Sequence, residues 1–140
     1  MKSEGRLDAF SGALMTYGCY DLGKTPSVAN WGDRKLILST PVIDFFADNL
    51  AIPADQLQNP LASPLYGDLR GMPPALFQCG TYDPLCDDTT FMAARWAQAG
   101  RVADTIWYPG GVHAFDYFDT SLAQRAEAGA AAFLNRVFTG

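Results

Sequence analysis

One acidic residue and one histidine follow two predicted strands at positions where they could do chemistry together. Asp83 comes four residues after the apolar run 75–79, and His113 comes five residues after the run 104–108. Binding groups collect beyond the carboxyl ends of parallel strands, and neighbouring strands lie only about 4.8 Å apart. A carboxylate at this edge could orient the imidazole, fix its tautomer and stabilise the imidazolium that forms during acyl transfer. The two residues therefore predict two thirds of a hydrolytic triad.

The same residues also have simpler interpretations. Asp83 precedes Pro84, and aspartate is common in turns whether or not it is catalytic. His113 could be a solvated or capping imidazole. Asp116 lies three residues past His113 and is a second candidate partner for its ring, although a side chain of the same loop would constrain the ring less. The spacing alone leaves these alternatives open.

Strands and helices are predicted to alternate along the chain in an order that places both residues at one edge. The strands are short, nearly continuous apolar runs, as expected for strands buried on both faces. Helix starts are predicted at Thr40-Pro41, at a cap on Asp87 or Asp88, and at a cap on Thr120. The strands are expected at 12–19, 75–79 and 104–108, and the helices at 40–50, 87–99 and 121–137. This order predicts an α/β fold with a parallel sheet covered by helices.

Two long connections are expected to lack regular structure. Residues 22–38 are polar and glycine-rich, which is typical of a long loop that shapes or covers a site. Residues 52–74 contain five prolines, which interrupt helical and strand hydrogen bonding. We therefore expect an ordered but irregular crossing before the second strand.

The composition supports one globular domain that spans residues 1–140. Hydrophobic residues make up 49% of the chain and charged residues only 18%, so a full core is available. The net charge of −5, without a basic cluster, argues against nucleic-acid partners. No apolar run approaches the roughly 18 residues that cross a bilayer, so no membrane span is expected. Mixed charges among the first eight residues do not fit a signal peptide, which favours a cytoplasmic location.

The cysteine and histidine content limits cofactor chemistry. Three cysteines without a C-x-x-C pair and a single histidine provide neither a disulfide framework nor a zinc site. We therefore expect no metal and no other cofactor. Cys19 and Cys79 sit in apolar runs and are expected to be small buried hydrophobes.

Three motifs resemble segments of one known family. The run GTYDPLCDD at 80–88 resembles the acid-bearing segment of hormone-sensitive-lipase-like carboxylesterases, the alpha/beta-hydrolase fold-3 group. The run YPGGVHAF at 108–115 is similar to their histidine loop, with Ala114 where many members carry glycine. The stretches 63–66 and 69–76 are similar to the segment that leads into the acid strand. These motifs keep the family's order and spacing, and the match extends from about residue 9 to residue 138.

The resemblance implies a partial alpha/beta-hydrolase fold with about three parallel strands and flanking helices. It also implies that Asp83 is the triad acid and His113 the general base of a carboxylic-ester hydrolase. Neither a G-x-S-x-G nucleophile elbow nor a His-Gly-Gly-Gly oxyanion loop occurs in the 140 residues. The chain then looks like the carboxyl-terminal portion of an esterase, nearly inert alone, with a small-molecule ester as substrate once an amino-terminal half completes it. Cys86 is a poor substitute nucleophile because it lies on the acid's own loop.

A second hypothesis is a non-catalytic α/β module that keeps this scaffold and serves in binding or assembly. The missing nucleophile favours this hypothesis. In this chain alone the first strand would lack the neighbour to which it is ordinarily hydrogen-bonded, and its unpaired edge is a template for pairing with another chain. We therefore expect a homo-oligomer. The sequence assigns no substrate-binding residue.

Overall fold

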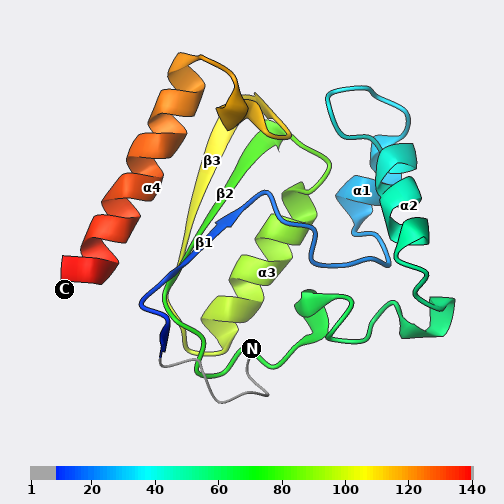
Figure 1. Ribbon diagram of the computed structural model, residues 1–140, viewed down its shortest axis with the longest axis horizontal. Coiled ribbons are helices and arrows are strands. Elements are labelled where there is room, and N and C mark those ends of the chain that lie inside the picture. Colours follow the sequence, from blue (N-terminus) through cyan, green and yellow to red (C-terminus); the bar gives the residue numbers. More distant parts are fainter. Residues whose placement is uncertain (1–8, 140) are drawn as a thin grey trace.

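A sheet of three parallel strands forms the centre of the computed structural model, which describes residues 9–139 (Figure 1). The strands are β1 (Ala13–Thr16), β2 (Ala75–Tyr82) and β3 (Ala103–Val112), in the spatial order β1-β2-β3. Helix α3 (Cys86–Gln98) covers one face of the sheet and helix α4 (Ser121–Thr139) covers the other. The predicted α/β architecture, a small parallel sheet with flanking helices, is confirmed.

The central strand β2 is buried on both faces through its first six residues. Phe77 points toward α3, where its ring packs against Trp96 with the two centroids 5.6 Å apart. The alternate residues Leu76 and Gln78 lie on the side of α4, and Gln78 Oε1 accepts a hydrogen bond from the Tyr108 hydroxyl at 2.6 Å. Because side chains alternate between the faces of a strand, a strand covered on both sides reads as a continuous apolar run.

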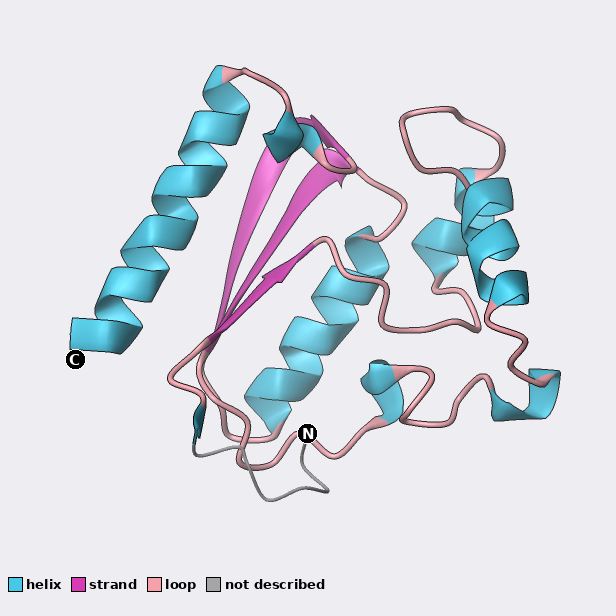
Figure 2. Cartoon of the chain, in the orientation of Figure 1, coloured by secondary structure: helices cyan, strands magenta, loops and turns pink. Residues whose placement is uncertain are grey.

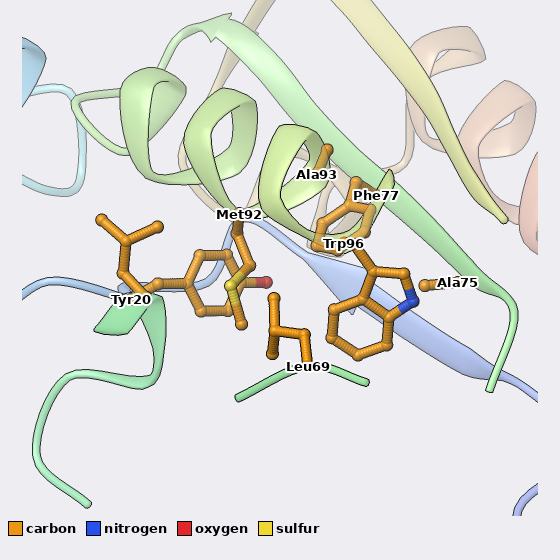
Figure 3. Close-up of a cluster of buried hydrophobic side chains, with 8 residues drawn as sticks. Tyr20, Leu69, Ala75, Phe77, Met92, Ala93 and Trp96 are labelled. Carbon is orange, nitrogen blue, oxygen red and sulfur yellow. The ribbon is translucent and has the colours of Figure 1, made fainter. Parts of the chain in front are cut away.

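The main apolar core lies between β2 and α3 (Figure 3). Helix α3, strand β2 and two loop segments each contribute to it, through Met92, Ala93, Trp96, Ala75, Phe77, Tyr20 and Leu69. The Trp96 indole N–H donates to the carbonyl oxygen of Pro73 at 2.9 Å, so its polar group is satisfied although the ring is buried. This core fixes α3, and with it the loop that connects β2 to α3.

Strands β2 and β3 are longer than the sequence indicated. The predicted stops at Gly80 and Pro109 are wrong, because β2 continues to Tyr82 and β3 to Val112. A Cβ atom on Gly80 would lie 2.2 Å from the carbonyl oxygen of Gly111, so glycine here allows two backbones to approach closely. The first strand is shorter than predicted and keeps only four residues.

The predicted loop 22–38 contains a short helix, α1 (Pro26–Trp31), which the sequence analysis missed. Its proline suits a helix start, but six residues carry too few apolar positions for a periodic signal. Val28 is buried against Ile43 of α2 (Thr40–Asn49). Thr40 was expected to cap α2, but it is the first helical residue, and its hydroxyl donates to the Val28 carbonyl at 2.6 Å. Helices α1 and α2 therefore form a pair that stands beside α3 (Figure 1).

The crossing 52–74 is irregular, as predicted (Figure 2). It contains two single-turn 3-10 helices, Ala54–Gln56 and Pro64–Tyr66. Leu65 and Leu69 are buried and anchor this crossing to the core.

The predicted N-caps of the last two helices have different outcomes. Helix α3 begins at Cys86, so Asp87 and Asp88 lie in its first turn and neither occupies the predicted cap position. The predicted cap at Thr120 is confirmed, because its hydroxyl oxygen accepts a hydrogen bond from the Ala123 N–H at 3.2 Å. In the part of the chain that the structure describes, no helix combines the length and apolarity needed to cross a membrane.

Candidate active site

The carboxylate of Asp83 and the imidazole of His113 are in contact at the carboxyl end of the sheet. Asp83 Oδ2 lies 3.0 Å from His113 Nδ1. Asp83 is only 1% exposed, whereas the side chain of His113 is 20% exposed. The second carboxylate oxygen of Asp83 accepts a hydrogen bond from the Leu85 N–H at 2.9 Å. The buried acid is thus held by the backbone that enters α3, while the imidazole reaches the surface.

The register between β2 and β3 produces this contact. Gly80 pairs with Tyr108, which is 28 residues further along the chain, but Tyr82 pairs with Val112, which is 30 residues further along. An irregularity between Gly80 and Tyr82 therefore advances β3 by two residues relative to β2. Because Asp83 and His113 directly follow the last pair, they leave the sheet opposite each other. Without this shift the residue opposite Asp83 would be Gly111.

The geometry sets the chemistry that the imidazole can perform. In its ionised form a carboxylate only accepts hydrogen bonds, so the contact with Asp83 places the imidazole proton on Nδ1. The lone pair then remains on Nε2, which can accept a proton from another group. A histidine held in this way can act as a general base, and the carboxylate stabilises the imidazolium that results.

The segment after His113 is fixed by packing. Ala114 adopts a left-handed conformation with φ of 55°, and a single 3-10 turn, Phe115–Tyr117, follows it. The ring of Phe115 is buried, with its centroid 5.0 Å from that of Tyr108 on β3. The turn therefore folds back onto the strand that delivers the histidine.

Asp116 was the second candidate partner for the imidazole, and the structure gives it a different contact. Its Oδ1 accepts a hydrogen bond from the Tyr17 hydroxyl at 2.9 Å. Among the described residues, the carboxylate that contacts the ring of His113 is that of Asp83. The imidazole therefore contacts the carboxylate that follows the neighbouring strand β2.

A mainly apolar cavity of about 470 Å³ opens beside His113. Its walls come from the end of β1, the segment that follows β1, and α2. Ile43, Phe46, Ala47 and Leu50 line the α2 side. Because these four residues recur at helical spacing, a search for the apolar stripe of the predicted helix 40–50 would have found this wall. No residue of this wall was predicted from the sequence.

The cysteines divide between the core and the cavity. Cys79 is fully buried, as expected, and a hydrogen bond with Cys86 together with burial raises the pKa of its thiol. Cys19 was also expected to be buried, but it is exposed and lines the cavity. Cys86 Sγ lies 3.3 Å from the carbonyl oxygen of Gly80, so this thiol turns back toward β2.

Asp88 ties the segment after β1 to the acid-bearing helix. Its carboxylate accepts hydrogen bonds from the Tyr20 N–H at 2.7 Å, the Asp21 N–H at 3.0 Å and the Thr25 hydroxyl at 2.6 Å. Burial raises the pKa of this carboxyl above its usual 3.8. The sequence could not reveal this contact, because the bonded groups lie more than 60 residues away along the chain. Across residues 9–139, no group of three or more His, Cys, Asp or Glu side chains gathers in a way that could hold a metal ion.

Comparison with known proteins identifies the class to which this fold and site belong. A family model described as alpha/beta hydrolase fold matches residues 1–117, a range that contains both Asp83 and His113. The chain therefore belongs to the alpha/beta hydrolase family.

The individual relatives are esterases and related hydrolases. The chain is 33% identical over 109 residues to an acetyl-hydrolase of Streptomyces hygroscopicus, an alignment that covers 76% of this chain and 36% of that protein. It superposes on a hyperthermophilic esterase from the archaeon Pyrobaculum calidifontis with a TM-score of 0.83 and 25% identity, over 92% of this chain and 43% of the other. A hormone-sensitive lipase from a metagenome library gives a TM-score of 0.85 at 23% identity, over 96% and 47% of the two chains, which shows the shared fold. The resemblance to hormone-sensitive-lipase-like esterases is confirmed, and the chain spans between a third and a half of the length of these relatives.

Proposed function

We propose that this chain supplies the acid and the general base of a carboxylic-ester hydrolase, with Asp83 as the triad acid and His113 as the base. The single observation that carries the proposal is the 3.0 Å contact between Asp83 Oδ2 and His113 Nδ1 beside an apolar cavity. Membership of a hydrolase family whose relatives include an acetyl-hydrolase and esterases supports the same reaction class.

The reaction has two steps, and in each of them His113 first accepts a proton and then returns it. First, Nε2 takes the proton of a nucleophilic hydroxyl as its oxygen attacks the ester carbonyl carbon. Nε2 then returns this proton to the departing alkoxide, which leaves as an alcohol and creates an acyl-enzyme. Water repeats the cycle on the acyl-enzyme and releases the carboxylic acid. Asp83 keeps the imidazole oriented throughout and stabilises its charged form.

The nucleophile and the oxyanion donors would come from the part of the fold that these 140 residues do not contain. The sequence has no G-x-S-x-G elbow, and Cys86 does not line the cavity beside His113. Each oxyanion donor is worth roughly 100- to 1,000-fold in rate, and without a nucleophile no acyl-enzyme forms. The chain alone should therefore not turn over short-chain nitrophenyl esters above background.

The apolar cavity would hold the hydrocarbon part of a small-molecule ester. Its volume of about 470 Å³ falls in the range of small-ligand sites, roughly 300 to 1,000 Å³. Apolar side chains of α2 form one wall, and His113 lies at the same cavity.

A homo-oligomer remains part of the proposal. Within residues 9–139, β1 pairs with β2 alone, and Phe10 and Leu14 beside this edge are 44% and 41% exposed. An unpaired strand edge with exposed apolar residues favours association with a further chain. Sizing at micromolar concentration should give a mass above that of the monomer. A clean monomer would contradict this part of the proposal.

The test of function is ester hydrolysis by this chain joined to an amino-terminal portion of the fold that carries a nucleophilic serine. His113→Ala and Asp83→Asn should each abolish most of the hydrolysis of a short-chain nitrophenyl ester. Asp119→Asn is the matched control, because this carboxylate is exposed and lies outside the site. Full activity in the His113→Ala variant would sink the proposal and favour the alternative, a non-catalytic binding or assembly module.

A further inference from the structure

Tyr17 stands out because its backbone is strained at the edge of the site. It directly follows β1 and has a φ of 36°, a left-handed value that residues other than glycine rarely adopt. Its N–H donates to the carbonyl oxygen of Gln78 at 2.7 Å, so the sheet holds this conformation in place. Such strain persists only where the surrounding structure over-determines it, and it clusters at functional sites.

The side chain of Tyr17 meets the histidine segment in two places. Its ring packs edge-on against the imidazole of His113, with centroids 4.6 Å apart and planes at 64°. Its hydroxyl donates to Asp116 Oδ1 at 2.9 Å, across 99 residues of sequence. Burial and the hydrogen bond to Asp116 raise the pKa of the Tyr17 phenol, so the hydroxyl stays a donor throughout the neutral range.

We infer that Tyr17 is a positioning residue for His113: it clamps the segment 113–117 against the end of β1 and occupies the Asp116 carboxylate. The inference rests on the proposed function, because it concerns the orientation of the proposed general base. Two consequences for the imidazole follow. The tyrosine ring covers one side of the imidazole and restricts its rotation. The hydroxyl also binds the Asp116 carboxylate, so Asp83 meets less competition for Nδ1.

Restraint of this kind matters because a general base changes charge during each cycle. When the imidazole becomes protonated, both of its nitrogens are donors, and a free carboxylate three residues away would attract the ring. A ring that turned toward Asp116 would lose its contact with Asp83, which directly follows β2. With Asp116 engaged by Tyr17, the contact to Asp83 is the favoured one in both charge states.

The test uses the fact that His113 is the one histidine of the chain, so its ring nitrogens can be assigned directly in ¹⁵N NMR. Tyr17→Phe keeps the ring and removes the hydroxyl. The matched control is Tyr117→Phe, which removes the hydroxyl of a residue in the same segment that is 84% exposed. We expect the wild type and the control to show one tautomer protonated on Nδ1, and Tyr17→Phe to show exchange broadening or a mixture of tautomers.

Hydrogen exchange provides a second readout. The N–H groups of Tyr117 and Phe118 bond to the carbonyl oxygens of Ala114 and Phe115, so their exchange reports opening of this segment. Tyr17→Phe should accelerate both roughly tenfold, the effect of one hydrogen bond to a charged group. The Ala29 amide in α1 should not change. Unchanged imidazole signals and unchanged exchange at Tyr117 and Phe118 would overturn the inference.

Variants of the partner separate the hydroxyl contact from a general loosening. In hydrogen exchange at Tyr117 and Phe118, Asp116→Ala should match Tyr17→Phe, whereas Asp116→Asn, which keeps an acceptor oxygen, should restore part of the protection. Because Asp116→Ala also removes the competing carboxylate, its imidazole should stay protonated on Nδ1. The double variant Tyr17→Phe/Asp116→Ala should exchange no faster than either single variant, because both remove the same bond. Additive acceleration would contradict a shared role.

The failures of the two proposals are distinguishable. If wild-type His113 lacks the tautomer protonated on Nδ1, the proposed function fails whatever Tyr17 does. If the wild type has that tautomer, and Tyr17→Phe changes neither the imidazole signals nor the exchange at Tyr117 and Phe118, only the inference about Tyr17 fails.

Discussion

The rim formed by β2 and β3 and the surface around β1 and α2 are built in different ways. At the rim, a buried central strand, a close Gly80–Gly111 approach and a register shift fix Asp83 against His113. Around β1 and α2, a four-residue strand has one partner among the described residues, and Phe45 and Phe46 are 63% and 60% exposed. The acid and base therefore sit in the firmly packed region, and the cavity borders the looser one.

This difference separates two kinds of requirement. A general base must keep its geometry to within fractions of an ångström, which a packed sheet edge provides. An apolar cavity wall needs only bulk and hydrophobicity, and it can be completed by other chain segments. Substitutions at the rim should consequently have large effects on activity or on the free energy of unfolding, and substitutions on α2 should have small ones.

The largest effect is expected from Asp83→Asn in the enzyme completed by its nucleophile. The amide keeps the shape of the side chain but can donate to the imidazole, which favours the wrong tautomer. We expect kcat to fall by roughly 10⁴-fold with KM little changed. Steady-state kinetics on a short-chain ester measures this. A fall in kcat of less than tenfold would show that the contact between Asp83 and His113 does not contribute to the reaction.

Gly80→Ala should disrupt the rim itself. The added methyl would lie 2.2 Å from the Gly111 carbonyl oxygen, and backbone cannot move away as a flexible side chain can. We expect a loss of about 3 kcal/mol in the free energy of unfolding, measured by denaturant titration. Gly100→Ala is the control, because nothing lies within 4 Å of its Cβ position and only its positive φ of 74° adds a cost of about 1 kcal/mol. Equal losses in the two variants would show that the strands can separate at little cost.

Asp88→Ala should loosen the tether between the two regions. It leaves three buried donors without their acceptor, so we expect a loss of about 2 kcal/mol in unfolding free energy. Asp88→Asn keeps an acceptor oxygen and should cost less.

The comparison of Asp88→Asn with the wild type also has a pH dependence. Because burial raises the folded-state pKa of Asp88 above 3.8, the stability that this group contributes is lost as pH rises through the folded-state pKa. The asparagine variant does not titrate at this position. The loss of unfolding free energy in Asp88→Asn, relative to the wild type, should therefore be largest at acidic pH and shrink toward neutral pH. A deficit that grows with pH would contradict the assignment.

The smallest effect on stability is expected on α2. Phe46→Ala and Phe45→Ala both remove exposed rings and should each change the unfolding free energy by less than about 0.5 kcal/mol. The two differ in that Phe46 lines the cavity and Phe45 does not. In the completed enzyme, Phe46→Ala should raise KM for an apolar ester while Phe45→Ala leaves it unchanged. An equal KM in both variants would show that the cavity does not bind the substrate.

The sequence predicted the elements of the rim because their signals are local. Apolar runs located β2 and β3, and the position of Asp83 and His113 after them indicated a shared edge. The two-residue shift in register could not be predicted, since it depends on how closely two backbones approach. Gly80 was accordingly interpreted as a strand end, although it permits that approach.

The looser region was harder to predict for a different reason. Helix α1 has one buried residue and six residues in all, so it shows no usable period. The contacts of Tyr17 with His113 and Asp116 span about 100 residues, and no local pattern encodes them. In this region, only the apolar stripe of α2 is a local pattern from which the cavity wall could have been predicted.

The most direct test of the central claim is the ¹⁵N NMR spectrum of the His113 imidazole in this chain, recorded above the pH at which the ring is protonated. If Asp83 and His113 form the acid and base pair, Nδ1 carries the proton in the wild type, and Asp83→Asn shifts the proton toward Nε2. A wild-type ring protonated on Nε2, or a tautomer that stays the same in Asp83→Asn, would contradict the account.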